Sequence, residues 1–283
     1  MNTQKVWFIT GASKGLGLHI VKELLKQGYQ VAATSRNKAE LSKQVGENPN
    51  FLPLSMELTA DEDVKKSIDQ VVDTFGRLDV IVNNAGFTQI GTLEELSDAE
   101  ARKNFDVNVF GVLNVIRNAV PYLRRQGMGH IFNISSIGGY IANFPSFGIY
   151  CSTKFAVAGL TEALAEELKP FGVHTTLVYP GYFRTDFLSK ESARLPMRTI
   201  EAYVHAREVQ EAHLNKIHGN QPNDPRKAAE VLIALSKQKK PPLHFFMGQG
   251  IDALVEQKME MVSAELGKNL TLSLSTGFSL SEN

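Results

Sequence analysis

Two side chains of complementary acid–base character, Tyr150 and Lys154, lie four residues apart in the sequence. In a helix this spacing places both side chains on one face, one turn apart. A lysine cation at about 5 Å, in a medium of effective dielectric about 20, stabilises a phenolate by roughly 3 kcal/mol, or about two pKa units. The pair therefore suits general acid–base catalysis, although Tyr-x-x-x-Lys also occurs often by chance.

Ser136 and Asn108 are candidates to complete such a site. Ser136 ends a predicted strand fourteen residues before Tyr150, where its hydroxyl would hold a carbonyl oxygen beside the phenol. The neighbouring Ser135 is the alternative for this role. Asn108 lies in a predicted helical stretch and, by itself, is equally consistent with packing or ordinary hydrogen bonding.

A glycine-rich turn, Thr-Gly-Ala-Ser-Lys-Gly-Leu-Gly at residues 10–17, follows the first predicted strand and begins the first predicted helix. Glycines let the backbone turn tightly and approach a pyrophosphate, which the free N–H groups of the helix N-terminus then bind. The spacing differs from that of a P-loop. By itself the turn predicts either a dinucleotide site or an ordinary strand–helix connection.

Two cations, Lys14 and Arg36, mark the expected ribose end of this site. An NAD site usually has an acidic residue at the end of the second strand, and none is present in Ala-Ala-Thr-Ser-Arg-Asn at residues 32–37. The cations would bracket a 2′-phosphate, so the sequence favours NADP(H) over NAD(H). The alternative is that both are solvated surface charges.

Strands and helices must alternate to position these residues. Short apolar runs predict strands at residues 5–10, 29–35, 51–55, 78–83, 130–135, 173–179 and 243–247. Helical periodicity is found at residues 16–27, 64–75, 98–125 and 150–169. This alternation predicts an α/β fold, a doubly wound and mostly seven-stranded parallel sheet of the Rossmann type with helices on both faces.

Composition narrows the class of protein. The 283 residues show no linker that would divide them, so we expect a single domain over residues 1–283. Lys and Arg number 30 and Asp and Glu also 30, which argues against a nucleic-acid partner.

One cysteine, Cys151, and widely spaced histidines predict no disulfide and no metal site. No signal peptide or membrane span is evident, so we expect a cytoplasmic protein.

Four motifs in the expected order resemble the short-chain dehydrogenase/reductase family, in its shorter, non-extended branch. They are Thr-Gly-x-x-x-Gly-x-Gly at residues 10–17, Asn-Asn-Ala-Gly at residues 83–86, Tyr150 with Lys154, and Pro-Gly-x-x-x-Thr at residues 180–185. The resemblance covers residues 5–187 well and residues 226–247 loosely.

The resemblance implies a carbonyl–alcohol oxidoreductase. Tyr150 would be the acid in reduction and the base in oxidation, and Lys154 would bind the nicotinamide ribose and lower the pKa of Tyr150. Ser136 would bind the reacting oxygen, and Asn108 would hold a water in a proton relay. The implied cofactor-binding residues are Gly11, Ser13, Lys14, Gly15, Leu16, Gly17, Arg36, Glu57, Leu58, Asn84, Ala85, Gly86, Tyr150, Lys154, Pro180, Gly181 and Thr185.

Two features depart from the family pattern. Glu57 stands where the family usually has an aspartate that contacts adenine. The interval from Ser136 to Tyr150 is one residue longer than usual, which leaves the choice between Ser135 and Ser136 open.

Two regions fall outside the alternating pattern. Residues 182–225 are expected to form a substrate lid, whose apolar residues either contact a partly apolar substrate or pack the lid onto the core. Residues 250–283 are expected to form a C-terminal helix followed by an extended arm, because Leu270, Leu272 and Leu274 alternate. The resemblance also implies a homodimer or homotetramer built on the helices around Asn104 and Tyr150.

Three function classes remain in view. The favoured one is an NADP(H)-dependent enzyme that interconverts a small-molecule carbonyl and an alcohol by hydride transfer. A non-catalytic NADPH-binding sensor or regulatory protein is the alternative. A dinucleotide-dependent epimerase or lyase is disfavoured, because the glycine spacing differs from that of the extended branch.

Overall fold

The fold is built on a parallel sheet. The computed structural model describes residues 4–189 and 192–278, and within them seven strands pair in the order β3-β2-β1-β4-β5-β6-β7, every pair parallel. The strands are β1 (Val6–Ile9), β2 (Gln30–Ser35), β3 (Phe51–Ser55), β4 (Val80–Asn83), β5 (Gly129–Ile134), β6 (Val173–Pro180) and β7 (His244–Met247). The predicted doubly wound fold is confirmed.

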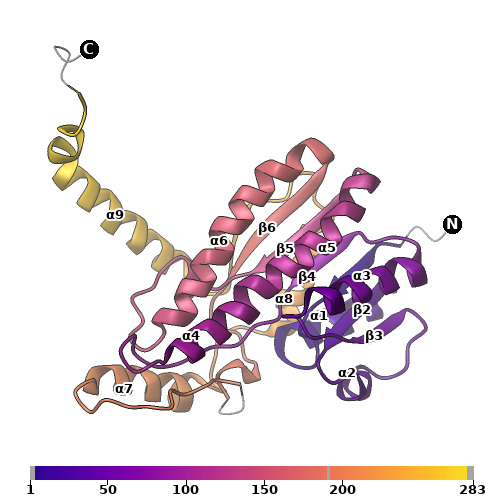
Figure 1. The fold of residues 1–283 in the computed structure, drawn as a ribbon, viewed down its shortest axis with the longest axis horizontal. Helices are drawn as coiled ribbons and strands as arrows, with labels where there is room; N and C mark the ends of the chain where they lie inside the picture. The colour runs from indigo at the N-terminus through magenta and orange to yellow at the C-terminus, as the bar shows by residue number, and fades with distance from the viewer. Residues whose placement is uncertain (1–3, 190–191, 279–283) are drawn as a thin grey trace.

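Helices cover both faces of this sheet (Figure 1). The α-helices of the described residues are α1 (Gly15–Lys26), α2 (Lys38–Val45), α3 (Asp61–Phe75), α4 (Asp98–Phe105), α5 (Gly111–Gln126), α6 (Gly148–Leu168), α7 (Val204–Glu211), α8 (Pro225–Leu235) and α9 (Ile251–Leu274). The helices α1, α2 and α8 pack on one face, and α3, α5 and α6 pack on the other.

The strands are apolar throughout because both of their faces are buried. In β1, Trp7 and Ile9 pack toward α1 and α8, whereas Val6 and Phe8 pack toward α3 and α5. All four side chains are fully excluded from solvent. A strand that must bury successive residues on opposite faces therefore appears in the sequence as a continuous apolar run.

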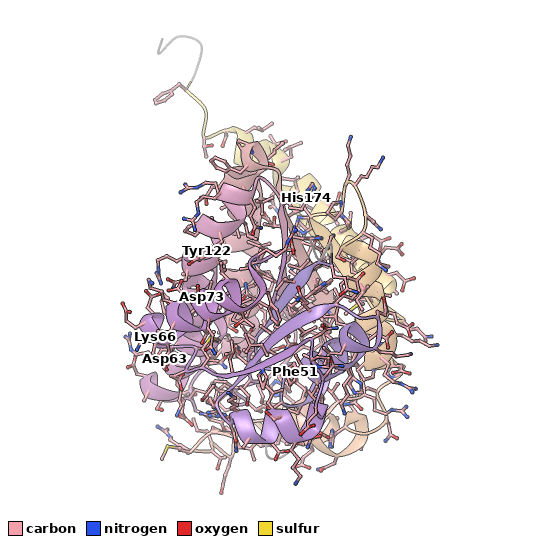
Figure 2. The ribbon with its side chains drawn as sticks, turned by 90° about the vertical axis from the view of Figure 1, so that its right-hand side faces the viewer. Phe51, Asp63, Lys66, Asp73, Tyr122 and His174 are labelled. Atoms are coloured by element: carbon pink, nitrogen blue, oxygen red, sulfur yellow. The ribbon has the colours of Figure 1, made fainter. Side chains whose placement is uncertain are left out.

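The helix α3 shows how a surface helix is recognised in the sequence. Val64, Ile68 and Val71 recur at helical spacing and lie buried against the sheet. Asp63, Lys66 and Asp73 are exposed, and Figure 2 shows this side of α3 at the surface of the molecule. The apolar stripe fixes which face of the helix turns inward.

The order of the strands determines where a ligand can bind. The sheet runs outward in both directions from the neighbours β1 and β4, so the chain connections diverge at this point. A crevice outside the carboxyl ends of the strands is the expected ligand site in such a fold. The turns that follow β1, β4, β5 and β6 all open toward this edge, since the strands are parallel.

One edge of the sheet is formed by β3, which pairs only with β2 among the described strands. Pro53 lies in the middle of β3 and is paired in register with Ala33. Because proline lacks a backbone N–H, it is tolerated in a sheet where that position faces away from the neighbouring strand.

The C-terminal prediction is wrong in one respect. The helix α9 runs without interruption from Ile251 to Leu274, so Leu270, Leu272 and Leu274 are helical and do not form an extended arm. Helix propagation adds one hydrogen bond per residue, and the short alternation does not override it. Residues 279–283 of the predicted arm lie outside the described residues. Figure 1 shows α9 leaving the body of the molecule.

None of the helices in residues 4–189 and 192–278 has both the length and the apolar character that a bilayer-spanning segment requires.

Candidate active site

A cavity of about 820 Å³ lies along the carboxyl edge of the sheet. Turns after β1, β2, β3, β4, β5 and β6 contribute to its wall, together with residues of the 182–225 segment. Nearly all the site residues predicted from the sequence line it. The two exceptions are Gly17 and Asn108, which support the wall from behind.

The glycine-rich turn is held against the end of β4. The Asn84 side-chain amide donates to the backbone oxygens of Thr10, at 2.9 Å, and Gly11, at 3.0 Å. The Thr10 hydroxyl accepts from the backbone N–H groups of Asn84 and Ala85, both at 3.1 Å. The turn thus has a defined position before any ligand binds.

Gly11 is required at its position for two reasons. Its φ of +66° is a left-handed conformation, and a Cβ there would lie 2.7 Å from the Cα of Ala85. A side chain would therefore push the turn away from β4 as well as strain the backbone. Gly17 has a similar constraint, because its Cβ would lie 2.6 Å from the Asn84 amide nitrogen.

The N-terminus of α1 faces the cavity without a capping side chain. Lys14 is the N-cap residue in an extended conformation, and no acidic residue lies in the first turn. The first N–H groups of the helix and their partial positive charge are left for a ligand. Together with the close-packed glycines, this arrangement fits the pyrophosphate of a dinucleotide.

Cationic side chains line the end of the cavity near β2. Lys14 and Arg36 are both exposed and both line the wall. The Lys14 ammonium donates to the hydroxyl of Ser192 at 2.5 Å, which links the turn to the 182–225 segment. Glu57 also lines this end, but its carboxylate accepts from the backbone N–H and the hydroxyl of Thr59.

Tyr150 and Lys154 lie together at the other end, near the start of α6. Their exposed fractions are 8% and 5%, and the Lys154 ammonium lies 5.8 Å from the centre of the Tyr150 ring. That ammonium donates to the backbone oxygen of Ile134 at 2.9 Å. Burial lowers the pKa of Lys154 to about 8, which still leaves it mostly charged at neutral pH.

The pKa of Tyr150 differs from the sequence-based expectation. Burial raises the pKa of the phenol well above its usual value, and a hydrogen bond with Ser136 partly opposes this rise. The expected lowering by the neighbouring lysine does not dominate, because removal of the phenolate from water is the larger effect. The protein alone therefore keeps Tyr150 protonated.

The structure gives Ser135 and Ser136 different surroundings. The Ser135 hydroxyl is buried and donates to the backbone oxygen of Lys154 at 2.9 Å. The Ser136 hydroxyl accepts from the Gly138 N–H at 3.1 Å and bonds with Tyr150. Ser135 therefore holds the helix to β5, whereas Ser136 presents its hydroxyl beside the phenol.

Asn108 lies in a single π-helical turn, Asp106–Phe110, between α4 and α5. Its side-chain amide donates to the Phe87 oxygen and the Thr153 hydroxyl, each at 3.0 Å, and its oxygen accepts from the Phe87 N–H at 3.1 Å. These contacts use both amide hydrogens and one lone pair of the oxygen. Asn108 thus connects Phe87, which follows β4, to α6, and its role in holding a water of a proton relay stays a prediction.

The residues after β6 connect the two ends of the site. The Gly181 N–H donates to the Met247 oxygen at 2.9 Å, which ties the turn to β7. A Cβ on Gly15 would lie 3.7 Å from the Thr185 side chain, so Thr185 sits directly beside the glycine-rich turn. Pro180, Gly181 and Thr185 all line the cavity.

Aromatic side chains form the wall around Tyr150. Phe144, Phe147, Phe183 and Phe187 line the cavity, and the Phe187 ring centre lies 5.9 Å from that of Tyr150. Three apolar residues further along the 182–225 segment behave differently from Phe183 and Phe187. Leu195, Met197 and Val204 are exposed by 50%, 92% and 63%, and they do not line the cavity.

The 182–225 segment is anchored to the body through Glu95. This buried carboxylate accepts from the N–H groups of Thr92, at 2.9 Å, and Ile200, at 2.8 Å, and pairs with Arg207. Burial alone would raise the pKa of Glu95, but these hydrogen bonds lower it to about 2. Lys190 and Glu191, within the predicted lid, lie outside the described residues.

One pair in the wall was missed by sequence reasoning. Tyr182 and His213 both line the cavity, and the Tyr182 hydroxyl lies 2.9 Å from Nε2 of His213. The two residues are 31 positions apart, so no local spacing signals their contact. Elsewhere in the described part of the chain, no group of three His, Cys, Asp or Glu side chains has metal-binding geometry.

Comparison with known proteins gives consistent results. A model described as short chain dehydrogenase matches residues 5–196. The oxidoreductase BOA17 of Botryotinia fuckeliana is 33% identical over 280 residues, which cover 96% of this chain and 99% of that protein.

Two solved structures extend the comparison. A short-chain dehydrogenase from Streptomyces avermitilis has a TM-score of 0.89 at 34% identity, covering 98% of this chain and all 100% of the other. ElxO with NADP bound has a TM-score of 0.72 at 28% identity, covering 89% of this chain and 100% of the other.

The position of Gly11 can be tested against another glycine. Gly76 also has a positive φ, of +77°, but a Cβ there would meet nothing within 4 Å. We expect Gly76→Ala to lower the free energy of unfolding by about 1 kcal/mol through backbone strain alone. Gly11→Ala should lower it by about 3 kcal/mol, because the contact with Ala85 adds overpacking.

Urea unfolding followed by the fluorescence of Trp7, the one tryptophan of the sequence, measures both values. Equal losses in the two variants would contradict the close approach of the turn to β4.

Proposed function

Because this chain belongs to the short-chain dehydrogenase/reductase family, we propose that it is an NADP(H)-dependent oxidoreductase that interconverts a carbonyl and an alcohol, with Tyr150 as the general acid and base. The observation that carries the proposal is the continuous cavity, which joins the glycine-rich turn at one end to Tyr150 and Ser136 at the other. A nicotinamide-dependent oxidoreductase is the class that family membership supports, and the remaining details rest on this chain's own residues.

The proposal gives each part of the cofactor to a group of residues in or behind the cavity wall. Gly11, Ser13, Gly15, Leu16 and Gly17 would hold the pyrophosphate at the N-terminus of α1. Asn84, Ala85 and Gly86 would border the adenosine ribose, and Glu57 and Leu58 the adenine. Tyr150 and Lys154 would bind the nicotinamide ribose, and Pro180, Gly181 and Thr185 would border the carboxamide.

The bound nicotinamide supplies the hydride in reduction and accepts it in oxidation. In reduction, the Ser136 and Tyr150 hydroxyls bind the carbonyl oxygen, and Tyr150 donates its proton as negative charge develops there. Burial raises the pKa of Tyr150, so the phenol is protonated but is a weaker acid, and the Lys154 cation would stabilise the phenolate left after it donates its proton. In oxidation the Lys154 cation stabilises the phenolate that removes the alcohol proton.

Lys14 and Arg36 support the preference for NADP(H). Both line the cavity beside the end of β2, where a 2′-phosphate would lie. A phosphate on the ribose would gain charge-assisted hydrogen bonds from these two side chains. The 2′-hydroxyl of NAD(H) has no negative charge to interact with these cations. The end of β2 also lacks the carboxylate that usually accepts a hydrogen bond from this hydroxyl.

The catalytic role of Tyr150 has a direct test. We expect Tyr150→Phe to lower kcat/KM for ketone reduction by about a thousandfold, because the proton donor is lost. NADPH consumption with a panel of apolar and polar ketones measures this loss. Tyr140→Phe is the matched control, since Tyr140 packs against Tyr179 and Phe246 outside the cavity.

Retention of activity in Tyr150→Phe would refute the assigned role. Tight NADPH binding by the wild-type protein without turnover of any ketone would favour the alternative, a non-catalytic NADPH-binding sensor.

Cofactor preference is tested by removing the two cations. Replacing Lys14 and Arg36 together by alanine should raise the Kd for NADPH by about a hundredfold and leave that for NADH nearly unchanged. Fluorescence titration with both cofactors gives the four constants. Lys43→Ala, at an exposed position of α2 outside the cavity, is the control. Equal affinity of the wild-type protein for NADH and NADPH would contradict the assignment.

A homo-oligomer built on α5 and α6 is also proposed. Phe155 on the outer face of α6 is 41% exposed, and Phe110 at the start of α5 is 53% exposed. The π-helical turn that holds Phe110 packs against α6. Large apolar side chains gathered on one face are typical of subunit interfaces.

The cytoplasmic location stays a prediction from the sequence.

We expect the wild-type protein to sediment as a dimer or tetramer of its 31.2 kDa chain. Replacing Phe110 and Phe155 by glutamate should shift it to the monomer, because two buried charges would oppose association. Met197→Glu, at a position 92% exposed on the 182–225 segment, should leave the assembly unchanged. A monomeric wild-type protein would exclude this interface.

A further inference from the structure

The Tyr182–His213 pair is a polar feature in an otherwise aromatic wall. His213 is only 8% exposed, and its ring centre lies 4.6 Å from that of Phe147 and 6.5 Å from that of Phe144. Tyr182 follows the Pro180-Gly181 turn and is half-buried. The proton-transfer scheme above does not use either residue.

The hydrogen bonds of His213 define which of its nitrogens carries the proton. Its Nδ1 lies 2.7 Å from the backbone oxygen of Val209. A carbonyl oxygen can only accept, so Nδ1 is the donor. Burial lowers the pKa of His213, so the ring is neutral at pH 7 and its Nε2 carries no hydrogen.

The direction of the Tyr182 bond follows. Because Nε2 of His213 can only accept, the Tyr182 hydroxyl donates its hydrogen to it over 2.9 Å. The Tyr182 oxygen then has lone pairs and no hydrogen for the cavity. Among the described residues, His213 is the only hydrogen-bond partner of this hydroxyl.

The packing around His213 maintains this polarity. Phe144 and Phe147 pack against the imidazole. Turning the ring over would break its two hydrogen bonds, one with the Val209 oxygen of α7 and one with the Tyr182 hydroxyl. Tyr182 therefore presents a fixed acceptor to the cavity. An acceptor in this partly buried wall disfavours a ligand that covers it without offering a donor.

We propose that Tyr182, oriented by His213, selects substrates that carry a hydroxyl or N–H donor on an apolar body beside the reacting carbonyl. The substrate class is thus an apolar ketone with a neighbouring donor, together with the corresponding diol or amino alcohol. This inference rests on the proposed function. Tyr182 and His213 line the same cavity as Tyr150, and Phe147, which packs against His213, belongs to the same apolar cluster as Tyr150.

Three matched ketones separate donor recognition from size and polarity. They are propiophenone, its β-hydroxy derivative and its β-methoxy derivative. The γ-hydroxy homologue is added as a fourth compound, because it changes the distance between the carbonyl and the hydroxyl. The hydroxy compounds offer a donor, whereas the methoxy compound offers only an acceptor. We expect the better hydroxy ketone to exceed both other compounds by about tenfold in kcat/KM.

Two variants identify the source of this preference. Tyr182→Phe should reduce the ratio of hydroxy to methoxy ketone to about one. His213→Leu should also reduce it, because the Tyr182 hydroxyl can then turn its hydrogen toward a methoxy oxygen. Tyr203→Phe is the control and should retain the wild-type ratio, since Tyr203 donates to Glu94 outside the cavity.

Several outcomes would overturn the inference. A wild-type protein that reduces all these ketones equally well has no donor preference. If Tyr182→Phe retains the wild-type ratio of hydroxy to methoxy ketone, a residue other than Tyr182 determines the donor preference. A Tyr182→Phe variant whose Kd for NADPH rises about tenfold, with the ratio unchanged, would show that this acceptor serves the cofactor.

A binding measurement distinguishes failure of the inference from failure of the proposed function. Calorimetry of the protein with NADPH and the unreactive alcohols of the same series requires no turnover. About tenfold tighter binding of the hydroxy alcohol than of its methoxy analogue, lost in Tyr182→Phe, supports the inference even if no ketone is reduced. Equal binding of the two alcohols rejects it.

Discussion

The site depends on a reciprocal pair of hydrogen bonds between β5 and α6. The Lys154 ammonium donates to the Ile134 backbone oxygen, and the Ser135 hydroxyl donates to the Lys154 backbone oxygen, both at 2.9 Å. These bonds fix the first turns of α6 over the end of the strand. Tyr150 is thereby held beside Ser136. Two neighbouring positions are glycines, whose lack of a side chain permits this close packing. Gly139 leaves room for the Ser135 hydroxyl, and Gly86 leaves room for Asn108 and Lys154. A charged lysine is buried at this point, and its cost is offset by the carbonyl that it contacts.

The cavity has two ends of different physical character. At the β2 end, Lys14 and Arg36 remain exposed, and the N-terminus of α1 is uncapped, so this end attracts anions. At the α6 end, phenylalanine rings contribute to the wall and Tyr150 is buried, which strengthens the hydrogen bonds that Tyr150 makes. The raised pKa of Tyr150 and the lowered pKa of Lys154 have the same cause, which is their removal from solvent.

The sequence predicts the elements with strong local patterns and misses those defined by tertiary packing. The buried strands are recognisable as short continuous apolar runs, and α6 is recognisable because its apolar residues recur with a period of 3.6 residues. The helix α2 has a single buried residue, Leu41, and gives no such pattern. Tyr150 and Lys154 could be paired from their spacing, but burial, which sets their pKa values, cannot be read from spacing. Likewise, Tyr182 meets His213 only because the 182–225 segment folds back over α6.

Pro53 in the edge strand β3 has a consequence for how molecules of this protein can assemble. An exposed strand edge normally offers a row of backbone donors and acceptors to which another chain can add. In β3 one outward donor is missing, because Pro53 has no N–H. A further strand that paired with β3 would lack one backbone hydrogen bond at the centre of this five-residue strand. The β3 edge of the sheet is therefore a poor template for the addition of a strand from another molecule.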